Sequence, residues 1–234
     1  MRFLNISLVF SFLLLAIVSC GQKKNEKQST ARSVSDITAN INALKADTSL
    51  KKALAGQLLG IYEDDQKYRQ QLEGTFIKYG MQSKEVHELA DQMNRMDALN
   101  LIKVKAILDK YGWVGKDLVG QDGNSALYLV IQHADAQTRA AYLPMMQDAV
   151  KKNNALASDL ATLEDRVLLE QHKKQIYGTQ FSLNRKTGKY TLDPLEDPEH
   201  VNERRAKVGL GTIQSNLAKF GITGLKLTGY SAFN

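Results

Sequence analysis

The chain has 234 residues, of which 43% are hydrophobic and 24% are charged, and its formal net charge is +6. This length is enough for one domain with a hydrophobic core. The only cysteine is Cys20, so disulfide frameworks, thiol catalysis and cysteine-ligated zinc are excluded from the rest of the chain.

Residues 1–19 have the pattern of a secretion signal. Arg2 gives a positive start, and "LVFSFLLLAIV" is an apolar run too short to span a membrane. The run ends in "IVSC", which resembles the lipobox of bacterial lipoproteins. The resemblance implies cleavage before Cys20, acylation of this cysteine with chains such as palmitate, and a membrane anchor. Gly21 replaces the aspartate that retains many such proteins in the inner membrane, so the outer membrane is expected. The alternative is an ordinary signal sequence with an accidental cysteine.

The stretch from residue 20 to residue 35 is polar and lacks hydrophobic periodicity, so we expect a flexible tether. It carries four basic residues and one acidic residue, which leaves the remainder of the chain close to neutral. The pI near 9.2 therefore mostly reflects the tether. We expect no nucleic-acid partner.

Apolar residues recur at helical spacing from about residue 50 to residue 174. A first long helix should end at Gly80, a typical stop residue. A second should begin after Ser83, a plausible N-cap, and end at Gly112. Two long helices joined by a short turn predict an antiparallel hairpin.

The segments after this hairpin are shorter. "WVGKDLVGQDG" (113–123) is glycine-rich without phosphate-loop spacing, and it predicts turns. A short helix is expected over residues 125–134, and an amphipathic run covers residues 138–152. Pro144 inside this run predicts either a kink or the true first turn of the helix. A helix over residues 159–173 should follow, with Ser158 as its cap.

The character of the sequence changes after residue 174. The β-forming residues around "RKTG" predict a small β-hairpin. "DPEHVNERRAKVGL" predicts a short helix capped by Asp197, with Pro198 at its first position and Gly209 at its end. "TIQSNLAKFG" predicts another. The expected fold is mainly α, with an antiparallel long-helix hairpin, shorter helices in an orthogonal bundle and one small β-hairpin near the C-terminal third. Residues 36–234 should form a single helical domain.

Two aspartates interrupt the apolar stripes of the long helices. Asp65 lies 16 positions before residue 81, near the centre of the turn, and Asp97 lies 16 positions after it. At about 1.5 Å per residue both carboxylates should lie roughly 24 Å from the turn, and therefore at one level. Arg69 is one turn from Asp65, and Asn100 is close to the second stripe. An ion-pair network, a ligand or catalytic site, and exposure at a helix edge all remain open.

His133 raises a similar question. Its spacing from Leu129 and Val130 places it on an apolar face, either as a core residue with satisfied hydrogen bonds or as part of a site. Gln132 lies beside it. Asp165 and Arg166 lie within a later helix and form either a structural ion pair or part of a site.

Several blocks of this sequence resemble the signature blocks of an uncharacterised bacterial family, the domain of unknown function numbered 6624. They are "EDDQKYR", "MDALNLIKVKAILDKYGW", "LVIQHAD", "LEDRVLLEQHKKQIYGTQF" and "PLEDPEHVNERRAKVGLG". The resemblance brings no reaction. It implies that a set of polar residues occupies motif positions: Asp65, Arg69, Asp97, Asn100, Gln132, His133, Asp165, Arg166, Gln175, Tyr177, Gly178, Thr179, Gln180, Arg204 and Arg205. A core needs few polar residues, so we expect this set to converge on one pocket.

Three functions follow from this set. The first is a lipid-anchored envelope protein that binds a small or extended ligand. Arg166, Arg204 and Arg205 could recognise an anionic group, and "YGTQ" would form a wall where Gly178 allows close approach.

The second function is a hydrolase of envelope material. Asp65 and Asp97 could act as an acid/base pair, or His133 could be a base oriented by Asp165. No cofactor is predicted, although a divalent metal ion held by Asp65, Asp97 and His133 is a variant. The third function is a structural lipoprotein whose polar residues only fix helix register.

Overall fold

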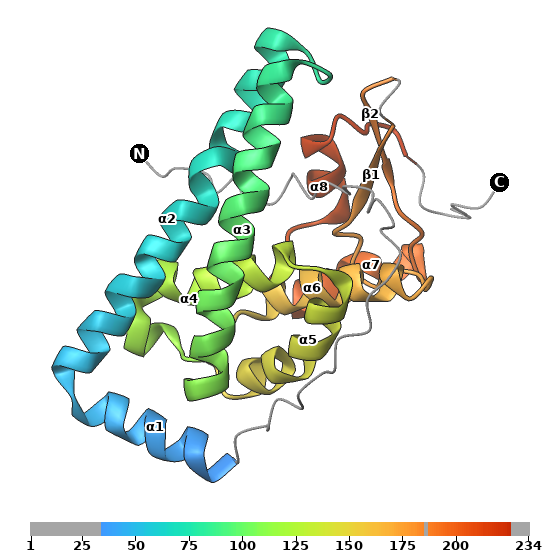
Figure 1. Cartoon of the computed structure of the whole chain (residues 1–234). Coiled ribbons are helices and arrows are strands. Elements are labelled where there is room, and N and C mark those ends of the chain that lie inside the picture. The colour runs from blue at the N-terminus through green and yellow to red at the C-terminus, as the bar shows by residue number, and fades with distance from the viewer. Residues whose placement is uncertain (1–33, 185–186, 226–234) are drawn as a thin grey trace, which may run out of the picture. The chain divides into compact units, whose positions relative to one another are not determined.

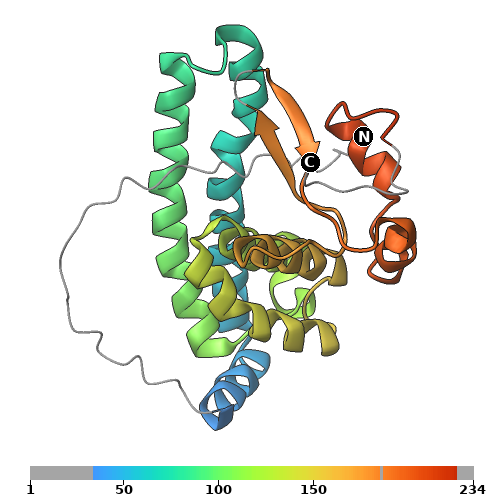
Figure 2. The ribbon, with the colours of Figure 1, turned by 90° about the vertical axis from the view of Figure 1, so that its right-hand side faces the viewer.

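The computed structural model describes residues 34–184 and 187–225. These residues are mainly helical, with eight α-helices, one 3-10 helix and two strands among them (Figures 1 and 2). The chain divides into two compact units, Met1–His133 and Ala134–Asn234, and each is described by itself. The single domain over residues 36–234 stays a prediction. The signal peptide, Cys20 and the tether as far as residue 33 lie outside the described residues.

Helices α2 (Thr48–Tyr79) and α3 (Lys84–Tyr111) form the antiparallel hairpin that the sequence predicted (Figure 1). Gly80 follows α2 with a φ of 84°, a backbone conformation that favours glycine. Ser83 caps α3 through its hydroxyl, and Gly112 ends that helix. The turn between the helices is therefore defined at both ends by residues visible in the sequence.

Helix α4 (Lys116–His133) packs against α2 and completes the core of the first unit. A Cβ on Gly123 would lie only 3.2 Å from the Cβ of Leu58, so this glycine allows close approach of α4 to α2. Burial of each large apolar side chain contributes about 1.5–3 kcal/mol. The three helices supply the core residues Leu54, Leu58, Ile61, Leu72, Val86, Leu89, Met93, Val104, Ile107, Leu108, Leu127, Val130 and Ile131.

Two features of the first unit differ from the sequence-based expectation. Helix α1 (Val34–Ala46) was not predicted, and it begins within the stretch assigned to the tether. Helix α4 begins nine residues before the expected helix, because the glycine-rich segment is itself largely helical. Gly120 alone leaves the helical region, with a φ of 78° and a ψ of 170°, and kinks α4.

Helices α5 (Ala136–Lys151) and α6 (Ala157–Glu170) pack together in the second unit. Pro144 lies inside α5 and does not mark its first turn, because Asp135 caps the helix and α5 begins at Ala136, eight residues before the proline. Ser158 does not cap α6. The cap position is Leu156, which makes no side-chain cap bond, and α6 begins before Ser158.

The C-terminal part of the second unit contains the small antiparallel β-hairpin that was predicted. Strand β1 (Phe181–Asn184) pairs with β2 (Lys189–Leu192), and Phe181 lies opposite Leu192. A short 3-10 helix, η1 (Pro198–His200), leads into α7 (Val201–Lys207), and α8 (Ile213–Lys219) follows. A hydrophobic cluster ties these elements together: Leu192, Leu195, Val201, Ile213 and Leu217.

Membrane spanning can be assessed only where the chain is described. Across residues 34–184 and 187–225, no helix combines the length and the apolar character that crossing a bilayer requires.

Candidate functional site

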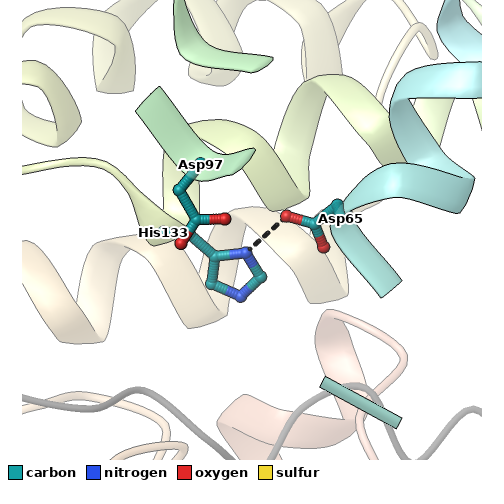
Figure 3. A group of neighbouring side chains, drawn as sticks. All are labelled: Asp65, Asp97 and His133. Atoms are coloured by element: carbon teal, nitrogen blue, oxygen red, sulfur yellow. Dashed lines mark hydrogen bonds and ion pairs between the residues drawn. The ribbon is translucent and has the colours of Figure 1, made fainter. Parts of the chain in front are cut away.

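Three helices bring Asp65, Asp97 and His133 together in the first unit (Figure 3). Asp65 lies on α2, Asp97 on α3, and His133 is the last residue of α4. One potential ligand atom from each residue lies within 4.8 Å of those of the other two. The hairpin therefore does place the two aspartates at one level, as their equal separation from the turn predicted.

Arg69 joins the two carboxylates. Its Nη1 lies 3.1 Å from Oδ1 of Asp65, and its Nη2 lies 2.7 Å from Oδ2 of Asp97. Nη1 also donates to the backbone carbonyl of Asp65 at 2.8 Å. The Arg69 side chain is only 8% exposed, so removing this cation would leave two acids poorly compensated. The ion-pair network is thus present, and Arg69 is its centre.

Asp65 is the most completely bonded acid of the cluster. Its Oδ1 accepts from Arg69 and lies 2.9 Å from Nδ1 of His133, while Oδ2 accepts from Nε2 of Gln66 at 2.7 Å. Burial acts to raise the pKa of Asp65, but the charges of His133 and Arg69 and the bonds from His133 and Gln66 outweigh it. The pKa therefore lies below its ordinary value, and Asp65 is a poor proton donor.

Gln66 was missed by sequence reasoning. It follows Asp65 directly, and neighbouring helical positions usually point in different directions, so the sequence carried no signal for this contact.

Three buried polar atoms in this neighbourhood have no hydrogen-bond partner among the described residues. They are Nε of Arg69, Oδ1 of Asp97 and Oδ1 of Asn100. Asn100 lies one turn beyond Asp97 and is fully buried, and its Nδ2 reaches the carbonyl of Ile61 only at 3.5 Å. Gln132 is also buried, beside His133 on α4. Arg69, Asp97 and Asn100 thus each make at least one hydrogen bond and keep one further polar atom without a partner among the described residues.

The remaining predicted site residues lie in the second unit, where Asp165 holds a loop. Its fully buried carboxylate accepts hydrogen bonds from the backbone N–H groups of Ile176, Tyr177 and Thr179 at 2.6–3.0 Å. The Thr179 hydroxyl donates a fourth, at 2.9 Å. Burial raises the pKa of Asp165 although these bonds act to lower it. This carboxylate is a structural anchor for residues 176–179.

Within the first unit, the carboxylate that orients His133 is Asp65, and the pairing of His133 with Asp165 expected from the sequence stays a prediction. His133 directs Nδ1 at Asp65, and Asp165 is occupied by four donors of its own unit.

Gln175 and Gln180 tie the same loop to the β-hairpin. Nε2 of Gln175 donates to the carbonyls of Gln180 and Asp193, and its Oε1 accepts from the N–H of Gln180. Gly178 has a φ of 66°, and a Cβ there would lie 2.6 Å from Cδ1 of Ile213. Its close approach is therefore to a core side chain of its own unit.

The arginines expected to bind an anion are used structurally. Arg204 donates to the carbonyls of Ile176 and Asp197 and pairs with the Asp197 carboxylate. Arg205 is 3% exposed and donates to the carbonyls of Tyr177 and Gly211.

Arg166 lies close enough to Asp193 to act on its pKa, which burial raises and Arg166 lowers. Asp197, the predicted cap of the helix after it, makes no cap bond and binds Arg204 and His200 instead.

The polar motif residues are thus divided between the two units, and each unit holds one group of them. The first unit holds Asp65, Arg69, Asp97, Asn100, Gln132 and His133. The second holds Asp165, Arg166, Gln175, Tyr177, Gly178, Thr179, Gln180, Arg204 and Arg205. Their convergence on one pocket stays a prediction.

A mainly helical fold with a buried aspartate–arginine–histidine network defines the structural class of this protein. The chain belongs to the family of unknown function DUF6624, whose model matches residues 52–226. No curated protein and no solved structure matches the chain significantly.

Proposed function

We propose that this protein is a lipid-anchored protein of the cell envelope whose cluster of Asp65, Arg69, Asp97 and His133 binds a small polar ligand. One observation supports ligand binding: Arg69, Asp97 and Asn100 each have a buried polar atom without a hydrogen-bond partner among the described residues. Leaving one such atom unpaired costs about 1–3 kcal/mol. Three of them in one neighbourhood favour a molecule that pairs them.

The charge of the cluster indicates the kind of ligand. Two carboxylates and one guanidinium leave one net negative charge while the imidazole is neutral. Of the three atoms without a partner, Oδ1 of Asp97 and Oδ1 of Asn100 are hydrogen-bond acceptors, and Nε of Arg69 is a donor. A ligand with an ammonium or hydroxyl group fits this pattern better than the anionic ligand considered from the sequence, since Arg204 and Arg205 are used by backbone carbonyls.

A divalent metal ion is the competing occupant. Asp65, Asp97 and His133 offer oxygen and nitrogen atoms within 4.8 Å of one another, a donor set that suits several divalent ions. Arg69 opposes this occupant, because its guanidinium already holds a cation's position between the two carboxylates. A metal ion would have to displace it.

The ligand proposal is tested by the thermal unfolding of the purified mature protein. Probes are ethanolamine, glucosamine, glycerol, inorganic phosphate and Mn²⁺ or Zn²⁺ alone. We expect an ammonium or hydroxyl probe to raise the unfolding midpoint and phosphate to leave it unchanged. At 100 times Kd the stabilisation is about 2.7 kcal/mol, which is a rise of about 5–10 °C for a protein of this size.

Asp97→Asn should abolish this rise, because it removes a charge of the cluster. Asp64→Asn is the matched control, since Asp64 lies beside Asp65 on α2 but pairs with Lys103 near the surface, and it should keep the rise. Stabilisation by phosphate alone, or by no probe at all, would contradict the proposal. Stabilisation by a metal ion alone would assign the cluster to the competing occupant.

A further inference from the structure

His133 and Asp65 form a buried pair with a defined direction. Nδ1 of the imidazole lies 2.9 Å from Oδ1 of Asp65, and the side chains are 8% and 1% exposed. Arg69 and Gln66 bond the same carboxylate from other sides, so Asp65 cannot turn away. His133 closes α4 and is held there by the core residues that precede it.

The carboxylate determines where the imidazole carries its proton. An ionised carboxylate only accepts hydrogen bonds, and the carboxylate of Asp65 is ion-paired with the guanidinium of Arg69, whose Nη1 lies 3.1 Å from Oδ1. The proton of the neutral ring therefore resides on Nδ1, which leaves a lone pair on Nε2. Nε2 has no hydrogen-bond partner within the described part of the chain, and it points away from both carboxylates (Figure 3).

The chain contains a natural comparison. His200 also directs Nδ1 at a carboxylate, Asp197, at 2.9 Å, but these side chains are 59% and 48% exposed. Water competes with an exposed pair of this kind. Of these two pairs, the buried one is therefore the pair in which the carboxylate can hold the ring in one orientation.

We propose that Nε2 of His133 is a general base that removes a proton from water, that Asp65 is its positioning residue, and that the bound ligand is an ester that this water hydrolyses. This inference rests on the proposed function, because the substrate must bind in the same cluster. The net negative charge there disfavours a phosphodiester, so the substrate class is a carboxylic ester without an anionic group.

The chemistry is balanced without a cofactor. Nε2 accepts one proton from water while the water oxygen bonds to the carbonyl carbon. The tetrahedral intermediate then collapses, and the carbon–oxygen bond to the leaving group breaks with its electron pair. The proton on Nε2 passes to that leaving oxygen or to solvent, and a carboxylic acid is released. General base catalysis of this kind contributes about 10²–10⁴-fold.

The position of the proton is tested directly by ¹⁵N NMR of the histidine rings. We expect the neutral ring of His133 to show a protonated Nδ1 and an unprotonated Nε2. Asp65→Asn should change this signature, since an amide can donate to Nδ1, while the His200 signals stay unchanged. A His133 ring with its proton on Nε2 would overturn the proposal.

The activity is tested with 4-nitrophenyl acetate, whose hydrolysis releases a coloured phenolate. We expect the mature protein to hydrolyse it in the presence of EDTA. His133→Gln should lower kcat by about 100-fold or more, because its amide can still donate to Asp65 but cannot accept the proton. Asp65→Asn should lower kcat by a similar factor with little change in KM. His200→Gln is the matched control and should keep full activity.

The outcomes separate this inference from the proposed ligand binding. Unfolding midpoints of the variants show whether each has folded. If ethanolamine or glucosamine stabilises the protein but hydrolysis is equal in the wild type and His133→Gln, the general base is overturned and ligand binding stands. Loss of hydrolysis on addition of EDTA would also overturn it, since a metal-bound water would then be the nucleophile.

Discussion

The pKa of an aspartate in this protein depends on its surroundings, as three examples show: Asp65, Asp165 and Asp159. Asp65 meets two basic side chains and an amide, and the pKa of this carboxyl is lowered despite burial. Asp165 meets backbone donors and one hydroxyl, which do not fully offset burial, so its pKa is raised. Burial alone raises the pKa of Asp159 to about 7. At the scale of single residues, the partners of a carboxylate decide whether it keeps its charge.

Asp159 should make the stability of the protein depend on pH. Its pKa in the folded state is about 7, above the ordinary value of 3.8, so the folded state binds more protons between these two values. Its contribution to stability is therefore present at low pH and is lost as the pH rises through 7.

Asp159→Asn should raise the free energy of unfolding by about 1–3 kcal/mol at pH 8 and have little effect at pH 4, as measured by urea unfolding. Asp148→Asn is a control, since Asp148 is exposed and pairs with Lys152. An Asp159→Asn effect that is the same at both pH values would contradict this account.

The loop over residues 175–180 is the clearest case at the scale of structural elements. Asp165 and Arg205 bind its backbone from two sides, and Gln175 binds it to the β-hairpin. Gly178 completes the element, because its φ of 66° and the proximity of Ile213 leave no room for a side chain. The residues of the "YGTQ" motif therefore serve to fix the conformation of this loop.

Gly178→Ala should destabilise the protein through both strain and overlap. The left-handed conformation costs about 1–2 kcal/mol for a residue with a Cβ, and the contact with Ile213 adds to it. Gly188→Ala is the matched control, since Gly188 has a φ of 68° but open space around it. Chemical unfolding should show a loss of about 2–4 kcal/mol for Gly178→Ala and a smaller loss for Gly188→Ala. Equal losses would show that the overlap has no effect.

Much of the element pattern was predictable because the deciding residues act locally. Gly80, Ser83 and Gly112 define the ends of α2 and α3 through their own backbone or hydroxyl. Helix α1 has only one buried residue, Leu44, so it gave little hydrophobic periodicity. The helical part of the glycine-rich segment was not predicted, because glycine has a low helix propensity and only the packing of Gly123 against Leu58 of α2 offsets it.

The site was predictable only in part for a related reason. The level of Asp65 and Asp97 follows from counting residues along two helices. The orientation of His133 toward Asp65 depends on how α4 packs against α2, which no local pattern encodes. Arg204 and Arg205 donate hydrogen bonds to backbone carbonyls whose positions depend on the loop conformation, and no local sequence pattern predicts that conformation either.

For the whole molecule, each of the two compact units contains its own polar network. The network of the second unit is largely closed on its own backbone, whereas that of the first leaves buried atoms without a described partner. The lipid anchor proposed for Cys20 would keep both units at a membrane surface through the tether.

Cys20→Ser should abolish this attachment. We expect the wild-type protein to incorporate labelled palmitate and to fractionate with the outer membrane, and the variant to lose both the label and the membrane fraction. Ser19→Ala is the control, because it keeps a small residue and the cysteine. Gly21→Asp should redirect the protein to the inner membrane. Unlabelled wild-type protein would contradict the lipid anchor.

The length of the chain near the turn between α2 and α3 affects the distant cluster of Asp65 and Asp97. Asp65 and Asp97 meet because equal lengths of helix separate them from residue 81. One residue inserted between the cap of α3 and Asp97 would shift every later residue of that helix by about 1.5 Å and rotate it by about 100°. Surface turns usually tolerate changes of length. Here the number of helical residues on either side of the turn determines whether the two carboxylates meet, although the cluster lies roughly 24 Å from the turn.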